Sequence, residues 1–230
     1  MIEGLPIWIE IVFAVTFCLA LVLFYYANGR PKALMGLILG WSCLQSVLAF
    51  SGFYLMTDTM PPRFGLVLIP GILIIIYGVQ PRPMNEVRVN RNTTISTCLH
   101  AVRLPIEIVL FGLFTNKMIP QLMTFEGRNF DILIGITAPI MGWLFWQNKM
   151  SKQVLLVWNV IGLGFVLFIL VNAILSAELP FQQFAFDQPN RAVNYFPFVL
   201  LPGVIVPMVI YTHLSDMIII SKEIRQTSPN

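Results

Sequence analysis

Seven apolar stretches divide the chain, and each is long enough, or nearly long enough, to form a helix across a bilayer. A hydrocarbon core of about 30 Å requires about 20 helical residues. A helix is expected there, because every backbone polar group inside the core must be bonded within the segment. The stretches cover residues 6–27, 33–56, 64–80, 95–115, 131–147, 153–175 and 194–220. We therefore predict an all-α bundle of seven transmembrane helices.

The composition indicates a single integral membrane domain over residues 1–230. Apolar residues make up 57% of the chain and charged residues only 11%, whereas roughly 25% of a soluble domain is charged. So few charges could not cover the surface of a soluble protein of this length. We expect a multi-pass protein of the cell (inner) membrane, with the lipid bilayer as its first partner.

The sequence lacks the residues that three functional classes require: nucleic-acid binding, a cysteine-based zinc or disulfide site, and nucleotide binding through a phosphate loop. The net charge of +3 comes without a basic stripe, so no nucleic acid is expected as a partner. Cys18, Cys43 and Cys98 lie in apolar runs without a CxxC pair, which is typical of small buried residues rather than of a zinc site or a disulfide. No glycine-rich phosphate loop occurs. We predict no metal and no cofactor.

The distribution of basic residues predicts the orientation. If the N-terminus lies outside, nine basic residues fall in the inner loops and four in the outer loops. The inner residues are Arg30, Lys32, Arg82, Arg88, Arg91, Lys149, Lys152, Lys222 and Arg225, and the outer residues are Arg63, Lys117, Arg128 and Arg191. Because inner loops carry the excess of basic residues, we predict an N-out, C-in topology.

The third and seventh stretches share a gapless pattern. The segment 63–72 (RFGLVLIPGI) aligns with the segment 195–204 (YFPFVLLPGV). The alignment suggests a parallel 3+1+3 repeat, with units 6–80 and 131–220 joined by helix 95–115; the alternative is a chance match of apolar residues. Proline in mid-span removes a backbone hydrogen bond, so we expect breaks in both helices.

The second half of the chain also resembles a known set of sequences. Asp131, Gly135, Thr137-Ala138-Pro139, Trp158-Asn159, Gly162 and His213-Leu214 form the pattern. Over about residues 125–215 it is similar to uncharacterised bacterial seven-helix membrane proteins. The resemblance implies a location in the membrane and no activity.

The fourth stretch carries three ionisable residues on one helical face. His100, Arg103 and Glu107 are spaced by three and four residues, which aligns their side chains along a helix. Counted from the inner end, they lie at roughly 8, 12 and 18 Å depth. A charge in mid-membrane costs about 3 kcal/mol on insertion scales, so each residue needs a reason to be there.

The seventh stretch carries a second set near its inner end. His213 and Asp216 share a helical face, and Asn159 of the sixth stretch or Gln45 of the second could join them. We predict a pathway for a substrate or proton and assign no catalytic residue; the pathway residues are His100, Arg103, Glu107, Asn159, His213 and Asp216. The sequence leaves open whether the fourth and seventh helices meet.

Purely structural explanations compete with this prediction. Arg103 and Glu107 could form an ion pair that fixes helix packing, and Asp216 could reach water at the inner interface. His213 could bond a backbone carbonyl. Asp131 is placed at the outer rim, where a charge costs little.

Three functions remain open. The first is a transporter or channel for a proton or small solute, in which Glu107 exchanges protons and a histidine relays them. The second is an intramembrane enzyme acting on a lipid or isoprenoid, although no HExxH or DDxxD motif is present. The third is a non-catalytic assembly subunit. Haem ligation by His100 and His213 is a further alternative.

The loop between the sixth and seventh stretches bears on partners. Three phenylalanines (Phe181, Phe184 and Phe186) lie within the loop 178–191, outside the predicted spans. This loop could lie on the outer interface as an amphipathic lid, or it could dock a second copy or a membrane partner.

Overall fold

The computed structural model describes residues 1–227, and in these residues helices and loops make up the fold, without a strand. The helices are α1 (Ile7–Ala27), α2 (Lys32–Phe50), α3 (Gly65–Gly78), α4 (Pro81–Asn90), α5 (Thr93–Leu99), α6 (Arg103–Thr115), α7 (Asp131–Trp146), α8 (Lys152–Leu175) and α9 (Val206–Thr227). A 3₁₀ turn, His100–Val102, joins α5 to α6, and a π-helix, Leu201–Ile205, precedes α9. The predicted all-α architecture is confirmed.

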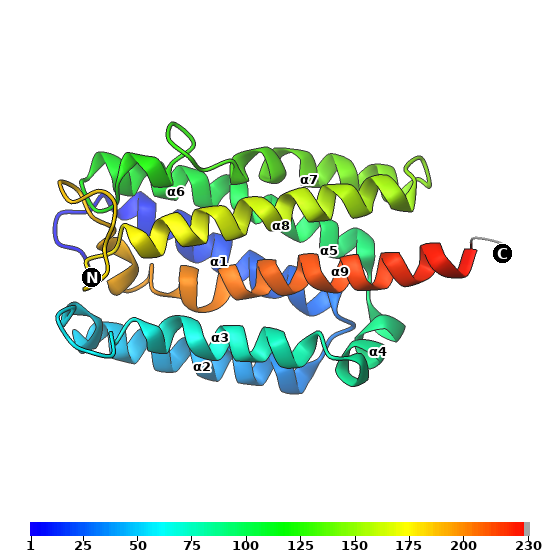
Figure 1. Cartoon of the computed structure of the whole chain (residues 1–230), viewed down its shortest axis with the longest axis horizontal. Helices are drawn as coiled ribbons and strands as arrows, with labels where there is room; N and C mark the ends of the chain where they lie inside the picture. The colour runs from blue at the N-terminus through cyan, green and yellow to red at the C-terminus, as the bar shows by residue number, and fades with distance from the viewer. Residues whose placement is uncertain (228–230) are drawn as a thin grey trace.

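The long helices run side by side along the longest axis of the molecule (Figure 1). α2 and α3 lie on one side of α9, and α6, α7 and α8 lie on the other. The N-terminus and the last turn of α9 lie at opposite ends, and α4 crosses the end at which α9 finishes. We call these the N-terminal end and the C-terminal end of the bundle.

Five helical segments are long and apolar enough to cross a membrane: 7–27, 32–50, 93–115, 152–175 and 201–226. A sixth is obtained if α3 and α4 form one span, although the two are bent by 78° at their junction. α7 is apolar but has only 16 residues. The described residues are thus compatible with a membrane protein that has five or six spans by length and composition.

Two helix ends differ from the sequence-based boundaries. The second helix ends at Phe50 rather than near residue 56, because Gly52 takes a left-handed conformation with φ 74°. The seventh segment becomes helical at Leu201 rather than at 194, since Tyr195 is extended. Both shifts lie at the N-terminal end, where loops cover the bundle.

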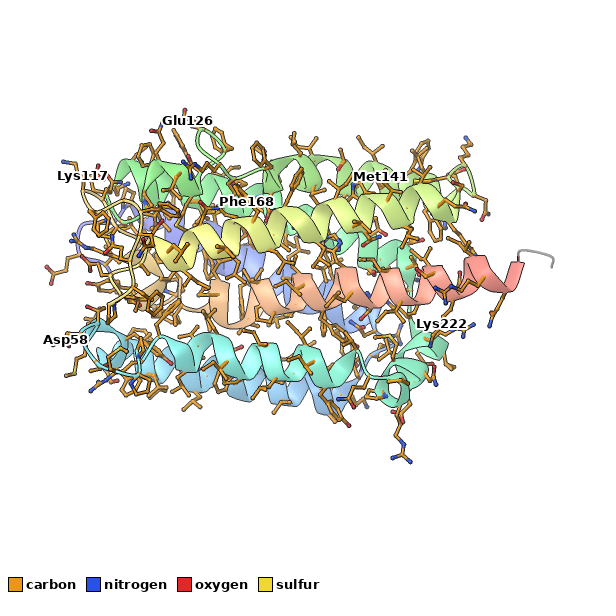
Figure 2. All side chains as sticks on the ribbon, viewed as in Figure 1. Asp58, Lys117, Glu126, Met141, Phe168 and Lys222 are labelled. Carbon is orange, nitrogen blue, oxygen red and sulfur yellow. The ribbon has the colours of Figure 1, made fainter. Side chains whose placement is uncertain are left out.

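The surface and the interior reverse the pattern of a soluble protein. Large apolar side chains such as Val15, Ile72 and Val157 are more than 45% exposed along the helix flanks, while His100, Arg103 and Asp216 are buried. Figure 2 labels Asp58, Lys117 and Glu126 near one end of the bundle and Lys222 near the other. Apolar flanks with charged ends match the profile of a bilayer.

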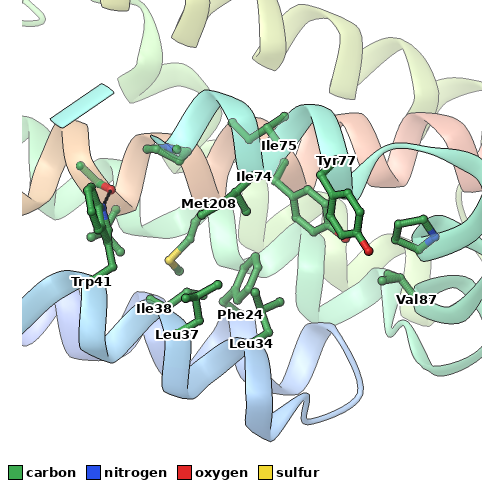
Figure 3. Close-up of a pocket in the computed structure, with 17 residues that line it drawn as sticks. Phe24, Leu34, Leu37, Ile38, Trp41, Ile74, Ile75, Tyr77, Val87 and Met208 are labelled. Atoms are coloured by element: carbon green, nitrogen blue, oxygen red, sulfur yellow. Dashed lines mark hydrogen bonds between the residues drawn. The ribbon is translucent and has the colours of Figure 1, made fainter. Parts of the chain in front are cut away.

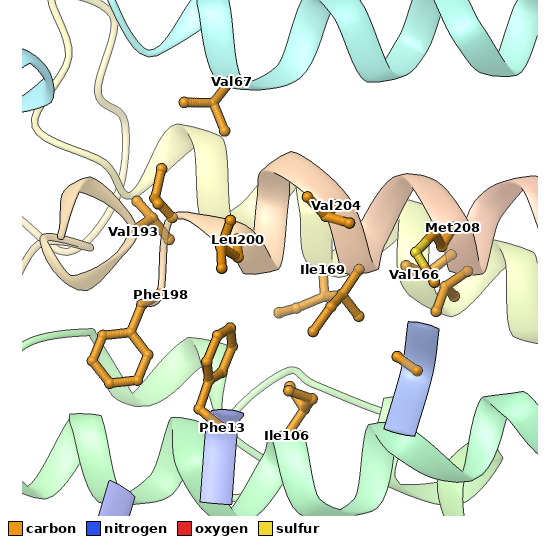
Figure 4. Packing of buried hydrophobic residues seen from close by; sticks show 14 of the residues in the cluster. Phe13, Val67, Ile106, Val166, Ile169, Val193, Phe198, Leu200, Val204 and Met208 are labelled. Carbon is orange, nitrogen blue, oxygen red and sulfur yellow. The ribbon is translucent and has the colours of Figure 1, made fainter. Parts of the chain in front are cut away.

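The apolar core lies where the helices meet around α9. Phe13 of α1 and Phe198 meet edge to face with ring centroids 5.3 Å apart. Val67 of α3, Ile106 of α6 and Val166 of α8 belong to the same buried cluster (Figure 4). This packing joins the α2–α3 side of the bundle to the α6–α8 side.

The two proline-containing segments behave differently. α3 stays helical through Pro70, and its sharp bend comes at residues 79 and 80 instead. In the seventh segment, Pro207 cannot donate to the carbonyl of Gly203, and the indole Nε1 of Trp41 donates to that oxygen at 3.1 Å. The side chain from α2 therefore replaces a missing helix hydrogen bond.

A buried polar cluster along α5 and α6

Four buried polar side chains line one face of the α5–α6 rod. Ser96, His100, Arg103 and Glu107 are at most 4% exposed. Their spacing of four, three and four residues keeps them on the side that faces the bundle interior. The rod carries them in order from the C-terminal end of the bundle toward the N-terminal end.

Two histidines from different helices meet at the middle of this face. The rings of His100 (at the α5–α6 junction) and His213 (on α9) stack with centroids 3.8 Å apart and an interplanar angle of 14°. The indole of Trp158 on α8 packs against His100 at 5.5 Å. The fourth and seventh stretches of the sequence therefore meet at the two histidines.

The hydrogen bonds of His213 define its tautomer. An Arg103 Nη2 lies 2.9 Å from Nε2 of His213, and because a guanidinium only donates, that nitrogen accepts. Nδ1 then carries the hydrogen and donates to Oδ1 of Asn159 at 2.8 Å. Asn159 in turn donates to the carbonyl of Leu155. His213 is thus neutral and held on both sides.

Arg103 links three helices through its terminal nitrogens. Nη1 pairs with Oδ1 of Asp131 on α7 at 3.2 Å, and both Nη atoms approach the carbonyl of Gly162 on α8. Gly162 also lets the His213 ring pack closely against α8, because a Cβ there would lie 2.5 Å from that ring. Arg103 therefore acts as the hub of the cluster.

Glu107 lies one turn further along, beside a small cavity. Its Oε1 accepts a hydrogen bond from Asn129, which also donates to the carbonyl of Met123. A cavity of about 30 Å³ is lined by Arg103, Glu107 and Asp131. Oε2 of Glu107 and Nε of Arg103 make no hydrogen bond to protein. A water needs about 10–15 Å³ and polar partners, so this cavity can hold one.

A second buried ion pair lies toward the C-terminal end. Nε of Arg91 bonds Oδ1 of Asp216 at 2.6 Å, and both side chains are at most 1% exposed. Asp216 also accepts a hydrogen bond from Ser96, and Arg91 donates to Asn28 and to the carbonyl of Thr212. This pair joins α1, α5 and α9 on the C-terminal side of the two histidines.

The structure brings the predicted pathway residues together and corrects several of their partners. Arg103 pairs with Asp131 instead of Glu107, because its side chain reaches across to α7. Asp216 does not reach water but is buried against Arg91. Asp131 is likewise buried rather than at an exposed rim. Gln45 lies apart from the cluster, where it accepts a hydrogen bond from Tyr54.

The stacked histidines also bear on the haem alternative. Their rings touch face to face, which leaves no gap for a porphyrin between them. In residues 1–227, no group of three or more His, Cys, Asp or Glu side chains is arranged to hold a metal ion. The cluster contains proton acceptors and donors that are linked by hydrogen bonds.

Several residues of the cluster were not predicted as part of the pathway, among them Asn28, Arg91, Ser96, Asn129, Asp131 and Gly162. Arg91 appeared as one basic residue of an inner loop, and Asn129 precedes the α7 stretch without any distinguishing pattern. Gly162 contributes through its backbone oxygen. One signal was present: Asp131 begins an apolar stretch, where a carboxylate without a partner is costly.

The helices and the buried cluster define a class: all-helical proteins with membrane-length apolar helices and a polar, titratable interior. Residues 60–221 match the family described as "Domain of unknown function (DUF8737)", and the chain belongs to this family. The expected likeness to an uncharacterised family is thereby confirmed. Neither a curated protein nor a solved structure matches the chain. The matched range holds every cluster residue except Asn28.

Proposed function

We propose that this protein moves protons, alone or together with a small solute, across a membrane that it crosses seven times. The observation that carries the proposal is the line of buried polar groups along α5 and α6. Ser96 and Glu107 are eleven residues apart, which corresponds to about 16 Å of helix rise. Asp131 joins the line beside Arg103 and Glu107, and Arg91 with Asp216 extends it toward the C-terminal end.

Proton transfer needs groups that can both accept and release a proton. Five such side chains lie in the line: Glu107, Asp131, His100, His213 and Asp216. His213 and Asp216 are three residues apart on α9, about one helical turn. A chain of titratable groups separated by single turns is the usual form of a proton relay inside membranes.

Several atoms in the line make no hydrogen bond to protein, and this favours the presence of a mobile proton or water. Both ring nitrogens of His100 are buried without a hydrogen bond to protein, as is Oε2 of Glu107. Leaving such atoms unpaired costs about 1–3 kcal/mol each, so they are expected to bind water or a proton in use. The cavity beside Glu107 provides room for that water.

The stacked histidines form the step at which transfer would be controlled. Stacked rings do not point an N–H of one toward a nitrogen of the other. A proton can pass between His100 and His213 only if a ring turns or a water enters. Arg103 and Asn159 hold His213 in place, so His100, which has no such bonds, is the ring that turns.

The seven-span, N-out, C-in topology belongs to the same proposal. The N-terminus and the last turn of α9 lie at opposite ends of the bundle, which fits an odd number of crossings. Nine basic residues are assigned to the C-terminal end and four to the N-terminal end, which favours a cytoplasmic C-terminus. Three-helix units at 6–80 and 131–220 remain part of the hypothesis, although α3 and the π-helix segment differ in shape.

The experiment is a flux measurement in proteoliposomes with a trapped pH dye and an imposed potential. Wild-type protein should acidify or alkalinise the lumen, and Glu107→Gln should abolish the movement. Glu126→Gln removes an exposed acid at the N-terminal end and serves as the matched control. Equal flux in wild type and Glu107→Gln would show that the line is not the pathway.

Two other functions would give different results. An intramembrane enzyme would convert a component of a lipid extract, and His213→Ala would stop the conversion. An assembly subunit would crosslink to a partner through the loop 178–191. That loop holds Phe181 and Phe186 exposed while Gln188 anchors it to the carbonyls of Phe114 and Ile119. Neither result would be accompanied by proton flux.

A further inference from the structure

A second cavity, of about 200 Å³, lies apart from the polar cluster. It opens between α2, α3 and α9, close to the C-terminal end of the bundle (Figure 3). Its wall includes Phe24, Trp41, Ile74 and Met208, and it reaches Pro83 and Val87 of α4. No residue of the polar cluster lines it.

The chemistry of the wall selects hydrocarbon. Apart from Tyr77 and Tyr211, which each carry one hydroxyl group, the lining side chains are apolar or aromatic, and the indole N–H of Trp41 is already bonded to Gly203. Apolar cavities of about 150 Å³ stay dry and bind molecules such as benzene. Leu37 and Ile74, which line the cavity, are 56% and 42% exposed, so it opens sideways on the apolar flank of the bundle.

Several basic residues are close neighbours in the sequence of the residues that line this end of the cavity. α4 is bent by 78° from α3 and lies across the end of the bundle, with Arg82 exposed next to Pro83 in the sequence. Arg88 follows Val87, and Lys32 lies two residues before the lining residue Leu34. Arg88 also donates to Gln226, and Glu86 is the acid on the exposed side of α4.

We propose that this cavity binds one acyl chain of an anionic phospholipid, whose phosphate group is paired by Arg82 and the neighbouring basic residues. The lipid comes from the leaflet that surrounds the C-terminal end. The proposal rests on the membrane location proposed above and does not depend on proton movement. The apolar cavity, the helix α4 across the end of the bundle and the basic residues follow one another in the same order as the acyl chain, the interfacial region and the headgroup of a phospholipid.

The charge of the rim predicts a preference between headgroups. A basic residue near the membrane surface contributes about fivefold to the binding of an anionic lipid. Phosphatidylglycerol should therefore be retained in preference to phosphatidylcholine, which has the same tails and no net charge. Loss of Arg82 should lower this preference about fivefold without emptying the cavity.

The test is native mass spectrometry of full-length protein taken from vesicles with equal amounts of phosphatidylglycerol and phosphatidylcholine that have the same tails. Leu37→Trp places an indole in the open side of the cavity and should abolish retention of lipid. Leu39→Trp, on the same helix, exposed and outside the cavity wall, is the matched control. Arg82→Gln is compared with Lys149→Gln, a basic residue between α7 and α8. Thermal unfolding checks that each variant is folded.

Three results would overturn the proposal. The first is equal retention in Leu37→Trp and Leu39→Trp, since the lipid would then bind elsewhere. The second is equal retention of the two lipids by wild type, which would show that the protein has no preference for an anionic headgroup. The third is an equal change of preference in Arg82→Gln and Lys149→Gln. Proton flux is measured separately, so its absence would leave these outcomes interpretable.

Discussion

At the scale of single residues, the interior is organised by charges that have found specific partners. Arg91 with Asp216 and Arg103 with Asp131 form ion pairs inside the bundle, whereas Lys152 with Glu223 and Arg191 with Glu178 pair at its surface. Removing one partner of a buried pair leaves the other charge without solvent or counter-ion. Removing one partner of an exposed pair costs little stability, because water replaces that partner.

Asp216→Asn should therefore destabilise the protein strongly. The change leaves Arg91 buried beside a neutral amide, and the expected cost is about 3–5 kcal/mol. Glu223→Gln, two turns further along α9, changes a surface pair and should cost at most about 1 kcal/mol. SDS-driven unfolding of the two variants measures the difference. Equal losses would mean that Arg91 and Asp216 are solvated.

Two glycines on α8 give a test of the packing around His213. Gly162→Ala should displace the ring, because the new Cβ would lie 2.5 Å from its Cε1. Overpacking of this kind costs about 1–3 kcal/mol, and proton flux should fall as His213 moves from Arg103. Gly164→Ala meets nothing within 4 Å and should behave as wild type. Identical flux in both variants would show that the position of His213 is unimportant.

The residues of the site were predictable to the extent that periodicity determines a helical face. His100, Arg103 and Glu107 do share one face of the α5–α6 rod. Asn159 was predicted as a possible neighbour of His213, because it is a polar residue within an apolar stretch, and the two side chains do form a hydrogen bond. The pairing of Arg103 with Asp131 was not predicted, since the two residues lie 28 positions apart in the sequence. The spacing of four residues predicted an ion pair of Arg103 with Glu107. In the tertiary structure Arg103 pairs with Asp131 of α7 instead.

At the scale of the helical elements, the seventh segment depends on a side chain from the second. Pro207 deprives the Gly203 carbonyl of its helical donor, and a π-helix forms just before this point. Trp41 supplies the donor across the interface between α2 and the π-helix. π-helical turns are frequent at functional sites, and this one lines the small cavity beside Glu107 through Leu201 and Ile205.

Trp41→Phe should weaken this interface. The phenyl ring fills most of the same space but leaves the Gly203 carbonyl unbonded, at a cost of about 1 kcal/mol in a membrane setting. Trp146→Phe, at an exposed position, should change stability by less than about 0.5 kcal/mol. Unfolding measurements on both variants check the prediction. A loss in Trp146→Phe as large as that in Trp41→Phe would argue against the hydrogen bond.

The helix positions were predictable and the helix breaks were not. Each apolar stretch of the sequence forms a helix, because a long apolar run favours one regardless of its neighbours. Prolines at 70 and 202 were expected to break the two helices in mid-span, but α3 continues through Pro70 and Pro202 lies in the first turn of the seventh helical segment. The bend that the structure shows follows α3 at residues 79 and 80, where α4 turns across the end of the bundle.

At the scale of the whole molecule, the crossing of α7 decides the topology. Its 16 residues span about 24 Å, less than the thickness of an average hydrocarbon core. If α7 crosses, Glu126 and Gln147 lie on opposite sides of the membrane. If it does not, the loops on either side of it lie on the same side.

Cysteine labelling separates these cases in a variant in which Cys18, Cys43 and Cys98 are replaced by alanine. A membrane-impermeant thiol reagent should label Glu126→Cys in intact cells. Gln147→Cys should react only after the cells are opened. Labelling of both positions from the outside would show that α7 lies in the membrane without crossing it, and the seven-span topology would then be wrong.

The sequence by itself determined the helices, their apolar flanks and the face of the fourth helix that carries ionisable groups. These properties follow from hydrophobicity and from the 3.6-residue period, which are local. Only the tertiary structure decided that His100 stacks on His213, that Arg103 joins Asp131 and that Arg91 covers Asp216. The physical reason is that a buried charge takes the partner that packing brings within reach, and packing brings together residues such as Arg91 and Asp216, which are 125 positions apart in the chain.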